Sequence, residues 1–266
     1  MVVSFDLVSA LILAVVQGIT EWLPVSSSGH LVVAQKLLGF DGGLKFDIAL
    51  HFGTLMAAFV YFGGDIVEIT RELLAGRWRS GQGRLGLVLV VATIPAAICG
   101  LIFKSVVESA FYSLGVVALG FCITGVCLII ASMDFGIKKK INSLNELSYK
   151  DSFTIGLSQV FALLPGISRS GMTISSGLLA GLDEKQALRF SFLMSIPIIF
   201  GANIVTIGNS RLPPDWIWAT LTSFIVGLVA LHVLINYVLS SKKNLLWFGL
   251  YAVLLGISLE IWVLFF

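Results

Sequence analysis

Three ionisable side chains of this 266-residue chain cluster at two polar segments that interrupt apolar stretches, where a charge is costly. Glu21 and His30 flank one polar segment, and Arg169 lies in a second one. Ionisable groups in apolar surroundings usually serve binding or catalysis, because only a close partner or a function offsets the cost of burying them. We therefore take these three residues as the centre of a candidate site.

Serines accompany the ionisable residues, and each run of serines precedes a short predicted helix. They are Ser26, Ser27, Ser28, Ser168 and Ser170. Hydroxyls and free N–H groups at a helix N-terminus bind anions, and Arg169 adds a planar donor fork that suits phosphate. Serines also cap helices without any ligand. Capping does not explain Arg169, however, which needs an anionic partner, either Glu21 or a ligand.

Two residue spacings indicate catalysis and metal binding. Ser27 and His30 are three positions apart, and a hydroxyl near an imidazole is the basic arrangement for nucleophilic catalysis. Gln17 and Glu21 are four positions apart and share a helix face, so their oxygens offer a site for Mg²⁺ or Ca²⁺. The alternative is that Glu21 is a buried carboxylate paired with Arg169.

Other polar residues in apolar stretches fit supporting roles. Asp47 and His51 are one turn apart and fit a second layer around the site, whereas His232 and Asn236 fit helix packing and Glu260 fits an interfacial position. Anion recognition, a divalent cation, a hydroxyl nucleophile and a base together fit phosphoryl transfer or hydrolysis on a lipid-linked phosphate.

The composition indicates where this chemistry takes place. Hydrophobic residues make up 57% of the chain, charged residues 12%, and the mean hydropathy is +0.98. A soluble domain is about one quarter charged. This composition excludes a soluble enzyme, a nucleic-acid-binding protein and a disordered chain, and it predicts an all-α polytopic membrane protein in contact with the bilayer.

Six stretches have the length and apolarity of transmembrane helices. They are residues 46–62, 85–103, 114–133, 190–207, 217–239 and 245–265. Residues 7–38 and 153–182 differ, because each consists of two short apolar pieces broken at a polar tip that contains Gly and Pro. Broken helices are tolerated in a membrane only when protein or a wet cavity surrounds them. We interpret both regions as re-entrant helical hairpins.

The two hairpin regions match each other when one is shifted by 142 positions, with seven identities between positions 17 and 41. The identities include Gln17 with Gln159, Ser26 with Ser168, and Asp41 with Asp183. The chain is thus predicted to be a single domain over 1–266 that consists of two repeats, 1–133 and 148–266. Each repeat is a hairpin followed by three transmembrane helices. Because three is odd, the second repeat must be inverted, and the hairpin tips should meet near the membrane midplane.

The basic residues predict the orientation of the chain. Eleven of them fall on one face of this topology: Arg71, Arg77, Arg79, Arg84, Lys138, Lys139, Lys140, Lys150, Lys185, Lys242 and Lys243. Four fall on the other: Lys36, Lys45, Lys104 and Arg211. The richer face is predicted to be cytoplasmic. Both termini, and the face from which the first hairpin enters, are then extracytoplasmic.

Three motifs resemble those of the undecaprenyl-diphosphate phosphatases, also called bacitracin-resistance proteins. Residues 17–30 (QGITEWLPVSSSGH) resemble the first family signature, residues 164–173 (LPGISRSGMT) the second, and residues 189–193 (RFSFL) with Pro197 a third. The resemblance runs almost the full length. It implies a multi-pass protein of the bacterial inner membrane that hydrolyses undecaprenyl diphosphate to the monophosphate carrier, recycling it for cell-wall synthesis and removing the target of bacitracin. The oligomeric state stays open, a homodimer included.

The resemblance also implies roles for the site residues. Ser27 or His30 is the nucleophile or its activator, and we favour attack by Ser27 with help from His30 and a phosphoryl-enzyme intermediate. Glu21 takes a metal or acid/base role, with Gln17 as its partner at the divalent cation. The residues assigned to the diphosphate are Gln17, Ser26, Ser168, Arg169, Ser170 and Thr173.

Two other interpretations of the function stay open. Inverted repeats with broken helices are typical of secondary transporters, so the protein could flip a lipid phosphate or carry a small anion. Ser28-Gly29-His30 resembles the central piece of type-2 phosphatidic-acid phosphatases, but Ser175 stands where that family's second motif needs a histidine.

Overall fold

The chain folds into helices throughout the residues described by the computed structural model, namely 6–40, 42–136, 141–207, 213–238 and 241–265. The α-helices are α1 (Leu7–Thr20), α2 (Ser27–Leu38), α3 (Gly43–Tyr61), α4 (Gly63–Leu74), α5 (Gly81–Ile102), α6 (Lys104–Ala110), α7 (Leu114–Ser132), α8 (Tyr149–Phe161), α9 (Arg169–Leu179), α10 (Glu184–Ile207), α11 (Trp216–Val233) and α12 (Asn244–Phe265). A short 3₁₀ turn, η1 (Leu144–Glu146), precedes α8, and a π-helical turn, η2 (Leu234–Val238), follows α11.

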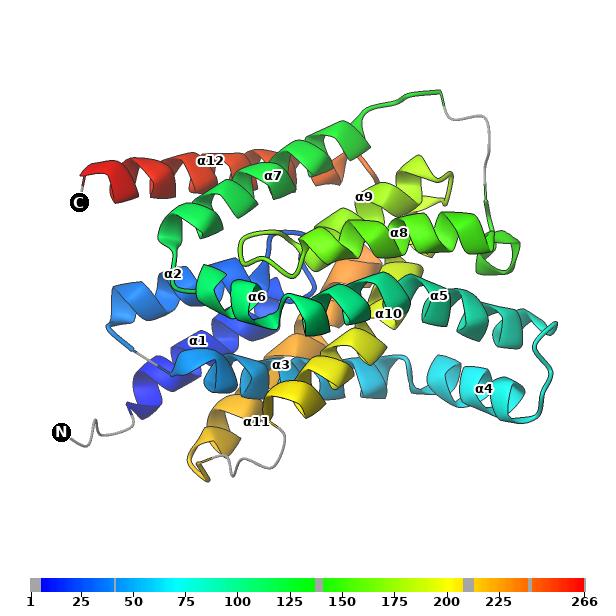
Figure 1. The fold of residues 1–266 in the computed structure, drawn as a ribbon, viewed down its shortest axis with the longest axis horizontal. Coiled ribbons are helices and arrows are strands. Elements are labelled where there is room, and N and C mark those ends of the chain that lie inside the picture. Colours follow the sequence, from blue (N-terminus) through cyan, green and yellow to red (C-terminus); the bar gives the residue numbers. More distant parts are fainter. Residues whose placement is uncertain (1–5, 41, 137–140, 208–212, 239–240, 266) are drawn as a thin grey trace.

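Six of these helices are long and apolar enough to cross a membrane: α3, α5, α7, α10, α11 with the start of η2, and α12. They coincide with the six predicted stretches, so the prediction of an all-α polytopic membrane protein is confirmed. The amphipathic α4 and the seven-residue α6 were not predicted. The described part of the chain begins and ends on the same side of the molecule, at the left of Figure 1.

The two broken regions form helical pairs, α1 with α2 and α8 with α9. Ser26 caps α2 by accepting a hydrogen bond from the N–H of Gly29, and Ser168 caps α9 by accepting one from Gly171. Both caps therefore use the positions that the 142-residue shift aligns. Each pair is followed by three of the six long helices, although Asp41, whose identity supported the repeat, lies outside the described residues.

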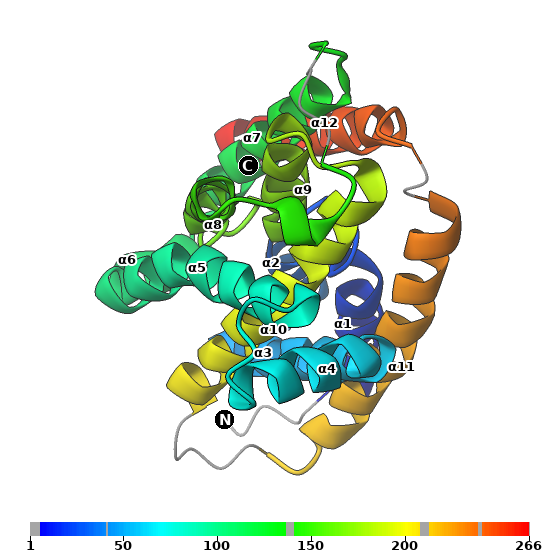
Figure 2. The same cartoon turned by 90° about the vertical axis from the view of Figure 1, so that its right-hand side faces the viewer.

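Helix packing follows the same pairing. Helix α1 packs on α11, α8 packs on α5, and α7 lies along α12, as the two perpendicular views show (Figures 1 and 2). A Cβ on Gly156 of α8 would stand 2.2 Å from the Ala92 carbonyl oxygen of α5, so these two helices need a glycine at their crossing. The inverted orientation of the halves and the re-entry of both hairpins stay predictions, as does the charge-based orientation, which also counts Lys138, Lys139, Lys140 and Arg211 outside the described residues.

The tips of the two helical pairs contact each other. The Ser170 hydroxyl of the second tip donates to the Leu23 carbonyl of the first at 3.1 Å. The second tip is held from α7 by Thr124, whose hydroxyl donates to the Gly166 carbonyl at 2.9 Å and accepts the Ser168 N–H at 2.8 Å. Gly166 adopts a φ of +88°, a conformation that favours glycine. The fold thus brings two segments together that are about 140 residues apart.

Candidate active site

A cavity of about 370 Å³ lies at the meeting point of the two tips. Its polar end is formed by both tips and by α3, and most of the rest is lined by apolar residues of α5 and α10. Helix α6 adds Lys104, Val107 and Glu108, and α8 adds Gln159. The polar lining residues of the tips and α3 are Glu21, Ser26, Ser27, Ser28, Asp47, His51, Ser168, Arg169 and Ser170. A cavity with one polar end and apolar walls suits a ligand that has a charged headgroup and a hydrocarbon tail.

Glu21 is the centre of the polar end. Its side chain is buried, and its Oε2 accepts hydrogen bonds from the Ser27 hydroxyl at 2.6 Å and the Gln17 amide at 3.0 Å. Its other oxygen, Oε1, forms an ion pair with Arg169 Nη2 at 2.7 Å. The predicted alternative, a buried carboxylate paired with Arg169, is therefore what the structure contains. The same carboxylate also holds the Ser27 hydroxyl.

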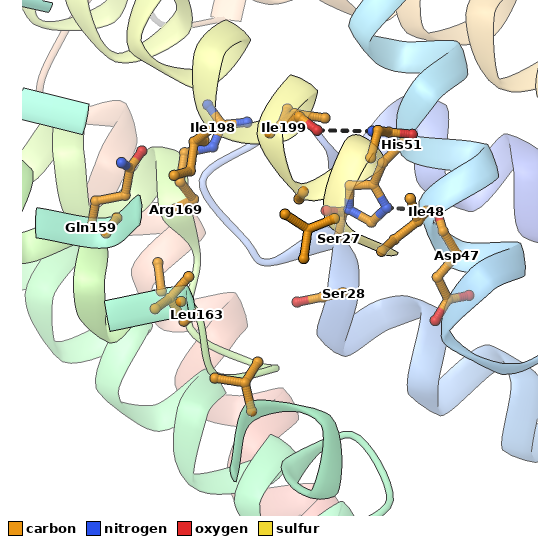
Figure 3. Close-up of a pocket in the computed structure, with 18 of the residues that line it drawn as sticks. Ser27, Ser28, Asp47, Ile48, His51, Gln159, Leu163, Arg169, Ile198 and Ile199 are labelled. Carbon is orange, nitrogen blue, oxygen red and sulfur yellow. Dashed lines mark hydrogen bonds between the residues drawn. The ribbon is translucent and has the colours of Figure 1, made fainter. Parts of the chain in front are cut away.

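His51 of α3 completes this cluster. Its Nε2 lies 3.4 Å from Glu21 Oε2, and its Nδ1 lies 2.7 Å from the backbone carbonyl of Asp47. A ring nitrogen facing a carbonyl must carry the proton. Nε2 therefore faces the carboxylate as an acceptor, unless a proton lies between the two groups. His51 and Glu21 together can hold one proton next to the Ser27 hydroxyl. Figure 3 shows Ser27 and His51 close to each other.

His30 is not part of the cluster around Glu21. Its Nδ1 is 2.7 Å from the Ser26 carbonyl, its Nε2 is 2.7 Å from the Tyr251 hydroxyl of α12, and its ring packs edge-on against Phe121. Both ring nitrogens are occupied, so the structure does not bring His30 to Ser27 as the spacing suggested. Among the described residues Ser26 is the only non-glycine with a positive φ, +69°, and His30 holds the carbonyl of this strained residue.

Of the remaining predicted residues, two serines line the cavity and one threonine does not. Ser168 and Ser170 line the cavity, with their hydroxyls 3.3 Å apart. Thr173 is absent from the described lining residues. Its hydroxyl donates to the Arg169 carbonyl at 2.9 Å and pairs with the Ser191 hydroxyl at 2.7 Å. Thr173 thus supports the helical turn that carries Arg169.

Comparisons with known proteins show the family of this chain. Residues 10–258 match the family model described as bacitracin resistance protein BacA. The chain belongs to the BacA family. It is 40% identical over 266 residues to an undecaprenyl-diphosphatase of Teredinibacter turnerae, covering 96% of this chain and 99% of that protein. It is also 39% identical to one of Moorella thermoacetica (93% and 94% covered) and 38% identical to one of Thermosipho melanesiensis (93% and 96% covered).

The BacA family model spans every candidate site residue, and the family resemblance stated from the motifs is confirmed. The sequence predicted that Glu21, Ser27 and Arg169 lie close together, and the structure shows Glu21 in contact with both of the others. His51 was predicted only for a supporting layer, and Thr124 and Tyr251 were not predicted. A histidine four residues after Asp47 in an otherwise apolar helix was the available signal for His51, since a lone polar ring at such a position needs a partner.

The fit of a divalent cation depends on Gln17 and Glu21. Among the described residues no group of three or more His, Cys, Asp or Glu side chains has metal-binding geometry. The Gln17 amide nitrogen faces the Glu21 carboxylate at 3.0 Å, and the Gln17 amide oxygen is buried without a hydrogen-bond partner. Glu21 and Gln17 can supply two oxygen ligands to Mg²⁺ or Ca²⁺ once the Gln17 amide turns its oxygen toward the carboxylate. A bound ligand must supply the other oxygens, because both ions take six or more.

A first prediction concerns Tyr251 and His30. We expect Tyr251→Phe to lower turnover about 3- to 10-fold without changing KM, since one hydrogen bond of about 1 kcal/mol that fixes His30 is lost. Tyr112→Phe, at an exposed residue outside the cavity, should have no effect. Turnover is measured as phosphate release from a lipid diphosphate.

The same assay decides whether the His30 ring itself is needed. His30→Gln keeps a side-chain donor for the Ser26 carbonyl, so we expect it to retain clearly more activity than His30→Ala. Equal loss in both variants would show that the imidazole acts in the reaction rather than by holding Ser26.

Proposed function

We propose that this protein hydrolyses undecaprenyl diphosphate to undecaprenyl phosphate and inorganic phosphate. One observation carries the proposal: the Ser27 hydroxyl donates to a buried carboxylate that is itself paired with Arg169, at the polar end of a largely apolar cavity. Such an arrangement provides a nucleophile, a proton acceptor and a permanent cation beside space for a lipid. The relatives named undecaprenyl-diphosphatase support the substrate.

The geometry favours attack by Ser27 on the terminal phosphorus. The hydroxyl proton passes to Glu21 Oε2, to which it is already hydrogen-bonded, and His51 shares it. The bond between the terminal phosphorus and the bridging oxygen breaks, and that oxygen leaves with the lipid monophosphate. The lipid monophosphate takes this proton as it leaves. A water then hydrolyses the phosphoserine: its proton passes to the Glu21–His51 pair, its hydroxyl bonds to the phosphorus, and the Ser27 oxygen leaves and takes the proton back from the pair.

Arg169 stabilises the charge that moves during this reaction. Its guanidinium lies within the cavity and has several donors, and only Nη2 is used by Glu21 while Nη1 lies 3.5 Å from the Ser191 carbonyl. The remaining donors can bind phosphate oxygens. A positioned cation in a water-poor site is the principal source of rate enhancement in phosphoryl transfer.

We further propose that the site opens to the extracytoplasmic side of the inner membrane. Lys104 of α6 lines the cavity, and Leu44, next to Lys45, does so too. Both lysines belong to the face predicted from basic residues to be extracytoplasmic. Both termini would then be extracytoplasmic. A homodimer is a further proposal, which the oligomeric state in detergent would test.

Phosphate release by the purified protein in detergent tests the proposed function. Release from undecaprenyl diphosphate that disappears in Glu21→Ala and persists in Glu146→Ala, an exposed glutamate outside the cavity, supports an enzyme. Binding without release would instead support the alternative, a lipid-phosphate flippase or small-anion transporter. In cells, expression of the active protein should raise bacitracin tolerance, and Glu21→Ala should not.

We propose that a divalent cation is held by Glu21, the Gln17 amide oxygen and the diphosphate. When bound, it would neutralise part of the diphosphate charge. We expect chelation with EDTA to lower phosphate release at least tenfold, and Mg²⁺ or Ca²⁺ to restore it. Gln17→Met, which removes the oxygen, should raise the cation concentration needed for half-maximal activity. Full activity in EDTA would exclude this role.

A further inference from the structure

Gln159 is a buried amide for which the protein offers no partner. It lies near the end of α8 with 1% of its surface exposed. Neither its amide nitrogen nor its amide oxygen makes a hydrogen bond, and both atoms are closed off from solvent. Burying a polar group without a partner is costly. A side chain that leaves both ends of its amide unpaired therefore indicates a partner that is absent from the free protein.

The corresponding residue of the first half shows what Gln159 lacks. Gln17 occupies the position aligned with Gln159, and its amide nitrogen donates to Glu21, four residues later. Four residues after Gln159 stands Leu163, which has no acceptor in its side chain. The second half thus keeps the amide without its carboxylate.

The position of Gln159 indicates where a partner would come from. Gln159 and Leu163 line the same cavity as Arg169 and Ser27. Figure 3 shows Gln159 and Arg169 on one side of this cavity and Ser27 and His51 on the other. Because the nearby wall is apolar at Leu163, an oxygen-rich ligand that enters the cavity is the available partner for the Gln159 amide.

We propose that Gln159 is a diphosphate-binding residue. When the headgroup enters the cavity, the Gln159 amide, which is closed off in the free protein, turns toward it, and its nitrogen donates to a phosphate oxygen on the Arg169 side. This inference rests on the proposed function. An anionic phosphate offers only acceptors, so the Gln159 amide oxygen takes its hydrogen bond from a protonated phosphate oxygen or a water that enters with the headgroup. The ligand chemistry is that of a phosphate group, on a lipid or free.

Gln159→Met tests the proposal in the purified full-length protein, because it keeps the length of the side chain and removes both polar atoms. We expect KM for undecaprenyl diphosphate to rise roughly 10- to 100-fold, which is the value of one hydrogen bond to a charged group, with kcat within about threefold. The melting temperature in detergent should stay the same or increase, since two unpaired buried atoms are removed. A residue with a structural role would instead lower it.

Gln159→Glu provides a second variant, because it keeps the shape but loses the donor and adds a charge that repels phosphate. We expect its KM to rise more than that of Gln159→Met. Gln186→Met is the matched control: its amide oxygen is also buried and unpaired, but it lies outside the cavity. Its KM should equal that of the unmodified protein.

Two ligand sources are separated by a thermal-shift experiment with inorganic phosphate. A smaller phosphate-induced shift in Gln159→Met places the contact on the phosphoryl group that is released. An unchanged shift together with the raised KM places it on the lipid-linked phosphate. An unchanged KM, or a lowered melting temperature with KM unchanged, would overturn the proposal. Failure of the unmodified protein to release phosphate would instead refute the proposed function.

Discussion

Ser27→Ala should lower phosphate release on the order of 1,000-fold or more, while the melting temperature in detergent changes by only a few degrees. The hydroxyl is the group that attacks in the proposed reaction, and removal of a nucleophile abolishes the covalent route altogether. The structural cost is small because Glu21 keeps its contacts with Arg169 and Gln17. Phosphate release at saturating substrate is the measurement.

Ser28→Ala is the matched control for this prediction. Ser28 lines the same cavity, and its hydroxyl lies 3.3 Å from the Ser26 hydroxyl. The serine hydroxyl that donates to Glu21 is that of Ser27. We expect Ser28→Ala to stay within about tenfold of the unmodified protein. If Ser27→Ala kept more than one tenth of the turnover, a water rather than Ser27 would be the nucleophile.

The intermediate itself can be detected. Substrate labelled in the terminal phosphate and quenched with acid during turnover should leave label on the peptide that contains Ser27. Glu21→Gln should slow both formation and loss of this label, because the same carboxylate accepts the proton in both steps.

Much of this fold could be predicted because transmembrane helices are determined by local composition. Each long apolar stretch satisfies its backbone hydrogen bonds within itself, so α7 and α12 follow from the residues they contain. The polar tips were recognisable for the same reason, since Pro24 and the Pro165-Gly166 pair interrupt apolar runs. The short helices α4 and α6 escaped notice, because charged residues in an amphipathic helix resemble those of a loop.

The partners within the site were harder to predict, because they depend on which helices pack together. Spacing placed His30 one turn from Ser27, and helical geometry does bring such residues close. The His30 ring nevertheless turns to Tyr251, 221 positions away. His51 reaches Glu21 only because α3 packs beside α1. The Glu21–Arg169 pair was predictable, since two opposite charges in an apolar protein have few other partners.

This ion pair gives the second large prediction. Arg169→Met should lower phosphate release on the order of 1,000-fold, and it should also destabilise the protein. The Arg169 and Glu21 side chains are 13% and 5% exposed, and leaving one charge of a buried pair without its partner costs about 3–5 kcal/mol. Glu21→Gln alone should destabilise for the same reason. Activity loss in either single variant therefore has two causes that must be separated.

The double variant Glu21→Gln/Arg169→Met separates them, because it removes both charges together. We expect its melting temperature to return most of the way to that of the unmodified protein, while phosphate release stays as low as in the single variants. Arg189→Met is the control for arginine loss in a membrane helix. Arg189 pairs with Asp65 and is not among the residues that line the cavity, so its loss should reduce stability but not the turnover of folded protein.

A return of activity in the double variant would mean that Glu21 and Arg169 only neutralise each other. Continued inactivity at restored stability would mean that the charges are kept for the substrate. A buried ion pair contributes little net stability compared with apolar residues of similar size. The pair at the meeting point of the two tips is therefore best explained by the anion that we propose it binds and by the Ser27 hydroxyl that Glu21 holds in place.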